Sequence, residues 1–167
     1  IGITPAESIE ALAAFQGVRR RLEVRGTVGG VTVIDDFAHH PTAIATTIAG
    51  LRARMQAGSH PGGRLLAVLE PRSNTMRTGT LKAQLPASLQ DADLVFCYAG
   101  GIDWDAQAAL APLGERVAVF RDMPALEAAI LAAARPGDQV LVMSNGGFGG
   151  IHGRLLAGLD SRKGNGK

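Results

Sequence analysis

The amino-acid sequence predicts an α/β fold, a Rossmann-like and doubly wound sheet of six mostly parallel strands with helices on both faces. Three observations predict it. Short, continuous apolar runs, typical of strands covered on both faces, recur at residues 65–69, 94–96, 117–120 and 140–143. Alanine-rich segments of helical character separate these runs. Two alternating strands around Gly29-Gly30 precede them and predict an N-terminal hairpin, which supplies the one antiparallel strand.

Local residue choices predict the individual elements. Thr4 and Glu7 form a capping-box pattern with Pro5 at the first helical position. A helix is therefore expected there, turning inward Ile9, Leu12 and Phe15. After Pro41, apolar residues recur at the helical spacing of Ile44, Ile48, Leu51 and Met55. Asp122 is expected to cap the alanine-rich helix that follows it.

Length and composition limit the classes of protein to which the chain could belong. Its 167 residues, 46% of them hydrophobic, suit one domain, expected over residues 1–160, with a disordered tail over 161–167. A net charge of +2 is too small for a nucleic-acid binder. The single Cys97 fits a reducing compartment, and we find no pattern of a membrane span or signal peptide, so a cytoplasmic location is expected. Because the chain begins with Ile1 instead of Met, we expect a fragment of a longer protein.

Ligands of open parallel sheets bind outside the carboxyl ends of the strands, so the residues after each predicted strand are candidates. The segment 35–41 (DDFAHHP) could bind a sugar hydroxyl, a metal or a phosphate, but a lone acidic or histidine pair more often caps the next helix. A zinc site is not expected, because the adjacent histidines lack further ligands. The segment 98–105 (YAGGIDWD) favours binding, with Trp104 as an alternative anchor for the following helix.

Three further segments carry groups that suit anions. The segment 70–77 (EPRSNTMR) suits carboxylate or phosphate recognition, and a solvated loop explains it equally well. The segment 144–152 (SNGGFGGIH) has four glycines before a helix, so backbone N–H groups can approach an anion there. It matches neither a P-loop nor a dinucleotide fingerprint. The cluster 19–21 (RRR) is either a solvated basic patch or a phosphate contact.

Together these segments resemble the C-terminal domain of the Mur ligase superfamily. The stretch 15–24 (FQGVRRRLEV) looks like the entry motif of that domain, and 35–42 (DDFAHHPT) is similar to its Asp-Tyr-Ala-His signature. Segments 69–76 and 143–152 look like those of the murein tripeptide ligases within the superfamily. One departure is Ala38, where the family has a lysine or an asparagine.

This resemblance implies an ATP-dependent ligase. It would join UDP-N-acetylmuramate to the recycled tripeptide L-alanyl-γ-D-glutamyl-meso-diaminopimelate through an acyl phosphate, in peptidoglycan recycling. Such ligases have three domains, and this chain would be the third, which binds the peptide and closes over ATP. The P-loop, the Mg²⁺ ligands and most of the ATP site would lie in the central domain, on which this domain packs. The isolated domain is therefore expected to be inactive, with no catalytic residue and no nucleic-acid or membrane partner.

Position within the family motifs also implies site residues. The resemblance assigns Arg21 to an ATP phosphate, Asp36 to the ribose and His39 to a place beside the nucleotide. It places the incoming peptide beside Arg72, Ser73, Asn74, Tyr98, Asp103, Ser144, Asn145, Gly146 and Gly147. Arginines and backbone amides are suitable partners for a peptide with several carboxylates. Whether His40 and His152 contact ligand or cap helices stays open.

Two other interpretations stay open as well. The chain could belong to the ligase that adds L-alanine to UDP-N-acetylmuramate, or to a synthetase of the folylpolyglutamate type. It could instead be a stand-alone module that binds nucleotide or phosphate, which predicts measurable ATP binding by the chain alone. We expect weak or undetectable ATP binding, because the P-loop would lie elsewhere.

Overall fold

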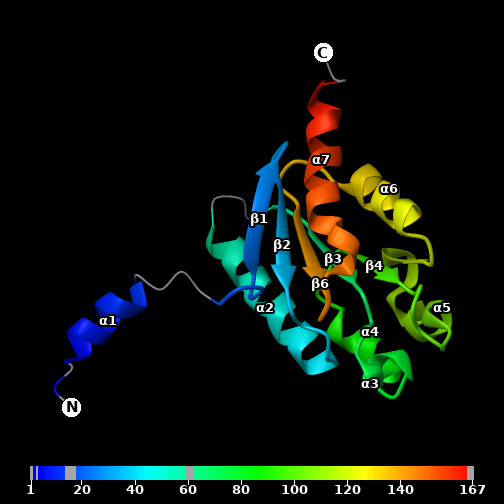
Figure 1. Cartoon of the computed structure of the whole chain (residues 1–167), viewed down its shortest axis with the longest axis horizontal. Helices are drawn as coiled ribbons and strands as arrows, with labels where there is room; N and C mark the ends of the chain where they lie inside the picture. Colours follow the sequence, from blue (N-terminus) through cyan, green and yellow to red (C-terminus); the bar gives the residue numbers. More distant parts are fainter. Residues whose placement is uncertain (1, 3, 14–17, 59–61, 165–167) are drawn as a thin grey trace.

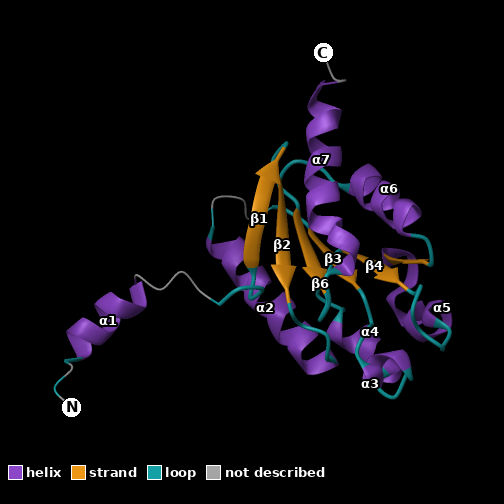
Figure 2. Cartoon of the chain, in the orientation of Figure 1, coloured by secondary structure: helices purple, strands orange, loops and turns teal. Residues whose placement is uncertain are grey.

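A computed structural model describes residues 2, 4–13, 18–58 and 62–164, and the predicted fold is confirmed. The described part contains a six-stranded sheet in the order β1-β2-β6-β3-β4-β5 (Figures 1 and 2). Its strands are β1 (Glu23–Val28), β2 (Val31–Asp36), β3 (Leu65–Leu69), β4 (Leu94–Tyr98), β5 (Val117–Phe120) and β6 (Gln139–Met143). Strands β1 and β2 are antiparallel, and every other neighbouring pair is parallel.

Helices cover both faces of this sheet. One face carries α2 (Pro41–Ala57), α3 (Asn74–Arg77), α4 (Leu85–Ser88) and α5 (Ala106–Leu110), and the other carries α6 (Met123–Ala133) and α7 (Ile151–Gly164). Short 3₁₀ turns lie at η1 (Lys82–Gln84), η2 (Ala111–Arg116) and η3 (Phe148–Gly150). On β3, Leu65, Ala67 and Leu69 face the first layer. Leu66 and Val68 face the second, so the apolar run is buried on both sides, as its sequence predicted.

The hairpin between β1 and β2 turns at the two glycines that predicted it. Gly29 and Gly30 have φ values of +61° and +78°, which a turn of type I′ requires at both central positions. A side chain at Gly30 would also meet Pro136, because a Cβ atom there would lie 3.1 Å from the Cβ of that proline. The turn therefore depends on glycine for conformation and for space.

Helix α1 (Pro5–Ala13) forms as its capping box predicted, but it does not pack as expected. The backbone N–H of Thr4 donates to Glu7 and that of Glu7 donates to the Thr4 hydroxyl, which completes the box. The expectation that Ile9 turns inward is wrong, because this residue is 67% exposed on a helix that stands apart from the sheet (Figure 1). The side chains of Leu12 and Phe15 lie outside the described part.

At the other end, α7 continues to Gly164 (Figure 1). The expectation of a disordered tail from residue 161 is therefore wrong for residues 161–164, and residues 165–167 lie outside the described part. Within the described residues, no helix is both long and apolar enough to cross a membrane.

A buried carboxylate fixes the amino-terminal edge of the sheet. Asp138 is 2% exposed and accepts hydrogen bonds from Arg64 Nε at 3.1 Å and Arg64 Nη2 at 2.6 Å. The backbone N–H groups of Arg64 and Arg135 donate to the same carboxylate. This pair raises the pKa of the Arg64 guanidinium, chiefly through the hydrogen bond to Asp138. One side chain thus ties the start of β3 to the start of β6.

At the opposite edge, α7 contacts β2 through His152. Its Nε2 lies 3.3 Å from Asp35 Oδ1 but makes no hydrogen bond within the described residues. The His152 side chain is 12% exposed. Burial lowers the pKa of His152 below its ordinary value, and the attraction of Asp35 opposes that shift only in part. His152 is therefore a half-buried imidazole whose charged form is disfavoured.

We predict that Asp138→Ala lowers the free energy of unfolding by about 3 kcal/mol, because it leaves a partly buried arginine and two backbone N–H groups without their acceptor. Urea denaturation measures the change. Asp105→Ala is the matched control: it removes an exposed helix cap, which costs about 1 kcal/mol. Equal losses in the two variants would contradict the role assigned to Asp138.

We also predict that His152 makes stability depend on pH. Its folded-state pKa lies below 6.5, so the unfolded chain binds the proton more readily between those two values. The free energy of unfolding should fall as the pH drops below 6.5 and stop falling below the folded-state pKa. Urea titrations of the wild type and His152→Gln from about pH 7.5 to about pH 5 isolate this contribution, because other titrating groups cancel in the difference. A difference that does not change with pH would show that the pKa is unshifted.

Candidate functional site

The segments predicted to carry chemistry meet at the carboxyl edge of the sheet. Strand β6 lies between β2 and β3, and α2 and α7, which follow β2 and β6, cover opposite faces. Two further hydrogen bonds join the ends of these strands: Ser144 N–H donates to Asp36 O, and Glu70 N–H donates to Met143 O. This edge is a topological switch point, where open α/β sheets bind ligands.

Ser144 holds the glycine-containing loop onto β3. It is 1% exposed, and its hydroxyl donates to Glu70 Oε2 at 2.5 Å and accepts the N–H of Gly146 at 2.9 Å. The hydroxyl that was expected beside the peptide is thus fully engaged within the chain. Ser144 positions the loop, and a substrate contact through its side chain stays a prediction.

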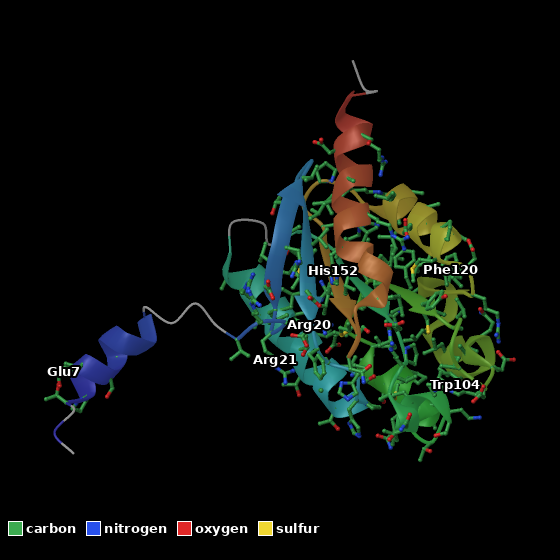
Figure 3. All side chains as sticks on the ribbon, viewed as in Figure 1. Glu7, Arg20, Arg21, Trp104, Phe120 and His152 are labelled. Carbon is green, nitrogen blue, oxygen red and sulfur yellow. The ribbon has the colours of Figure 1, made fainter. Side chains whose placement is uncertain are left out.

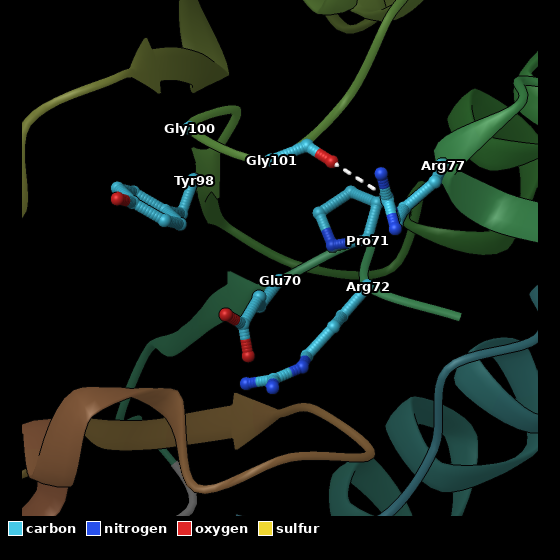
Figure 4. A pocket seen from close by; sticks show the side chains of 7 residues that line it. All are labelled: Glu70, Pro71, Arg72, Arg77, Tyr98, Gly100 and Gly101. Atoms are coloured by element: carbon cyan, nitrogen blue, oxygen red, sulfur yellow. Dashed lines mark hydrogen bonds between the residues drawn. The ribbon is translucent and has the colours of Figure 1, made fainter. Parts of the chain in front are cut away.

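A cavity of about 310 Å³ opens beside this loop (Figure 4). Its lining consists of Glu70, Pro71, Arg72, Arg77, Tyr98, Gly100 and Gly101. Arg72 and Tyr98 were expected there, whereas Glu70 and Arg77 were not assigned to the site although they stand at the two ends of the segment 70–77. Arg77 is oriented by donation from its Nε to Gly101 O at 3.2 Å. One carboxylate and two guanidinium groups around one cavity can bind carboxylates and an ammonium group.

Arg72 extends across the glycine loop. A Cβ atom built on Gly146 would lie 2.7 Å from Arg72 Nη1 and 2.9 Å from its Cζ. Arg72 is exposed, so its guanidinium covers the loop without being enclosed. Arg72 can therefore lie over the loop only because residue 146 is a glycine and has no side chain.

Three residues expected at the peptide site lie beside the cavity and not among its lining residues. Ser73 caps α3, because its hydroxyl accepts the N–H of Met76 at 3.4 Å. Asn74 and Asp103 are exposed. Trp104 is buried and donates from Nε1 to Met76 O at 2.7 Å, so its hydrogen bond holds α3 and not the helix that follows it, which was the alternative to binding.

The residues assigned to the nucleotide differ in their exposure to solvent and in their hydrogen bonds within the chain. Asp36 is 2% exposed, and its carboxylate accepts the N–H groups of Leu22 and Ala38, both at 2.8 Å. It also accepts the hydroxyl of Thr47 at 3.3 Å. A ribose contact through Asp36 is limited by access, because the carboxylate is almost fully enclosed by the chain. Arg21, in contrast, is exposed beside the ring of Phe37 (Figure 3).

The two histidines of the segment after β2 have local roles. His39 is half-buried, and its Nδ1 lies 2.9 Å from Phe37 O. His40 caps α2, because its Nδ1 accepts the N–H of Thr42 at 3.4 Å. The capping alternative for His40 is therefore confirmed.

A further polar residue at the carboxyl edge of the sheet was not assigned to the site from the sequence. Arg20, which is labelled in Figure 3, donates from Nε to Asp35 Oδ2 at 3.2 Å, and from Nη2 to Ser144 O at 2.6 Å and to Gly146 O at 2.9 Å. It stands within a run of three arginines, and nothing in the local sequence distinguishes this half-buried residue from its exposed neighbours. Asn145, on the same loop, has a side-chain oxygen that is shielded from solvent and makes no hydrogen bond within the described residues.

Known proteins resemble this chain in sequence and in fold. Residues 20–146 match the family model described as Mur ligase, glutamate ligase domain. A relative from Escherichia coli (strain K12), named as a UDP-N-acetylmuramate–L-alanyl-γ-D-glutamyl-meso-2,6-diaminoheptandioate ligase, is 47% identical over 95% of this chain and 34% of its own length. A relative from Mycobacterium sp. (strain JLS), named as a UDP-N-acetylmuramate–L-alanine ligase, is 39% identical over 97% of this chain and 34% of its own length.

A solved structure agrees with these relatives. It is a domain of an enzyme from Haemophilus ducreyi 35000HP, described as a putative UDP-N-acetylmuramate:L-alanyl-γ-D-glutamyl-meso-diaminopimelate ligase. It is 46% identical with a TM-score of 0.70, over 83% of this chain and 99% of that chain. The present chain spans about a third of the length of the curated relatives that it matches. By its family model, its relatives and its sheet topology, the chain belongs to the Mur ligase family.

Proposed function

We propose that the chain is the C-terminal domain of an ATP-dependent ligase that joins UDP-N-acetylmuramate to L-alanyl-γ-D-glutamyl-meso-diaminopimelate in peptidoglycan recycling. Residues 1–160 would form the domain, which binds the peptide and closes over ATP on a central domain outside this chain. The names of the relatives at 47% and 41% identity support this choice of member. The isolated chain is expected to be inactive.

The cavity beside Glu70 is the observation that carries the proposal. The tripeptide has several carboxylates, and its diaminopimelate residue has an ammonium group beside a carboxylate. Arg72 and Arg77 offer cations for the carboxylates, and Glu70 offers an anion for the ammonium group. A volume of about 310 Å³ lies at the lower end of small-molecule sites and suits part of a peptide. L-Alanine, with a methyl side chain, has no second charged end to occupy the paired arginines.

ATP would supply the phosphoryl group that activates the carboxylate of UDP-N-acetylmuramate. The exposed guanidinium of Arg21 suits an ATP phosphate, and both Arg21 and His39 lie beside the ring of Phe37, at 5.9 Å and 5.4 Å from its centre. Asp36 would support the nucleotide chiefly by fixing this turn, since its carboxylate is almost fully enclosed and binds two backbone N–H groups there. The Mg²⁺ ligands and most of the ATP site would lie in the central domain.

We predict that the full-length enzyme uses the tripeptide in preference to L-alanine. Phosphate release with UDP-N-acetylmuramate and ATP, measured with each amine in turn, gives the two values of kcat/KM. We expect a preference of at least about 100-fold for the tripeptide, the amount that two lost charge-assisted hydrogen bonds would remove. A preference for L-alanine would instead establish the alternative ligase, which the mycobacterial relative at 39% identity represents.

A second prediction concerns Gly146. In the full-length enzyme, Gly146→Ala should displace Arg72 and lower kcat/KM for the tripeptide about tenfold, as Arg72→Ala should, because each removes the same ionic hydrogen bond. In the Arg72→Ala background the same glycine substitution should add nothing, which a double-mutant cycle measures. Gly153→Ala is the control, since a Cβ atom there meets no other atom within 4 Å. Additive losses at positions 72 and 146 would refute the proposed contact.

A further inference from the structure

Arg20 lies where the segment that enters the domain meets the loop after β6. Its side chain is 28% exposed, and its donors bind one carboxylate on β2 and two backbone carbonyls of that loop. The backbone of Arg20 is held as well: its N–H donates to Glu23, and its carbonyl accepts the N–H of Phe37. It has a φ of +57°, a left-handed conformation that a non-glycine residue keeps only where its surroundings enforce it.

The two carbonyl groups that Arg20 binds determine the direction of two backbone N–H groups. In a trans peptide unit the C=O and the following N–H point in opposite directions. Since Ser144 O and Gly146 O point toward Arg20, the N–H groups of Asn145 and Gly147 point away from it. Neither of these N–H groups donates a hydrogen bond within the described residues. They form a pair of free donors on the face of the loop opposite Arg20.

We infer that Arg20 is a positioning residue, which fixes the loop 144–147 so that the N–H groups of Asn145 and Gly147 bind a carboxylate of the peptide. This inference rests on the proposed function for the identity of the ligand. In this role Arg20 acts through the loop, because its Nε and Nη2 are used within the chain. Arg21, one residue later, is exposed and available for ATP, so adjacent arginines act on different substrates.

The fork of Arg20 suits this task better than lysine would. A planar guanidinium can donate to Asp35 on one side and to two carbonyls on the other at fixed angles, whereas an ammonium group is a point charge on a flexible stem. Asp35 also has another cationic neighbour, because Arg25 Nη1 lies 4.0 Å away. When Arg20 is replaced, the negative charge of Asp35 therefore still has a cation nearby, whereas the loop loses both hydrogen bonds to its carbonyl groups.

The test uses the full-length protein with Arg20→Gln and Arg20→Lys, and Arg19→Gln as a charge-matched control on the same exposed segment. Hydrogen–deuterium exchange reports on the loop without any substrate. The amides of Ser144 and Gly146, which donate to Asp36 and to the Ser144 hydroxyl, should exchange at least about tenfold faster in both Arg20 variants. Peptides from β3 should exchange as in the wild type, which separates a local release of the loop from a general loss of stability.

Kinetics then connect the loop to the substrate. In both Arg20 variants the KM for the tripeptide should rise about tenfold while the KM for ATP stays unchanged, and Arg19→Gln should behave as the wild type. Unchanged loop exchange in Arg20→Gln, a wild-type KM for tripeptide in Arg20→Lys, or a parallel rise in the KM for ATP would each overturn the inference. If the wild-type enzyme does not use the tripeptide, the proposed function fails, whereas the exchange measurement still decides whether Arg20 holds the loop.

Discussion

Strand β6 hydrogen-bonds to β2 on one side and to β3 on the other, although it is the last strand in the chain. Its insertion brings together the carboxyl ends of three strands, and Arg20, in the segment before β1, binds Ser144, which lies 124 positions later in the chain. Both faces of β6 are buried, so a shift in its register would turn its apolar side chains into the wrong layers. Every contact at the carboxyl edge depends on this register.

The polar groups at this edge separate into buried ones that hold the backbone and exposed ones that are available to ligand. Asp35, Asp36 and Ser144 are all nearly inaccessible, and each binds groups of the chain itself. Burying polar groups is tolerable because they are hydrogen-bonded, and the result is a rigid set of turns. Arg21, Arg72 and Arg77 are exposed on those turns. A rigid support under exposed, charged side chains would suit the recognition of a charged peptide.

The sequence allowed the sheet and the place of the site to be predicted, because both follow from local patterns. The apolar run at β3, the two glycines of the hairpin and the Asp122 cap each formed as expected. Which of the adjacent arginines binds the chain itself could not be predicted. The position of Arg20 depends on its positive φ and on partners that lie on β2 and after β6. Similarly, the neighbouring residues in the sequence do not show that Ser73 caps a helix or that the side chain of Ile9 is exposed.

The exposure of the site also explains why one domain would be insufficient under the proposed function. Two unit charges 4 Å apart attract each other by about 1 kcal/mol in water, and by about 4 kcal/mol in the partly excluded environment near a protein surface. Arg72 and Arg77 face water on the open side of their cavity, so alone they would hold a carboxylate only weakly. A second domain that closes over this edge would exclude water and strengthen each of these contacts without any new residue. Closure would then couple peptide affinity to the nucleotide, because both substrates would lie between the same two surfaces.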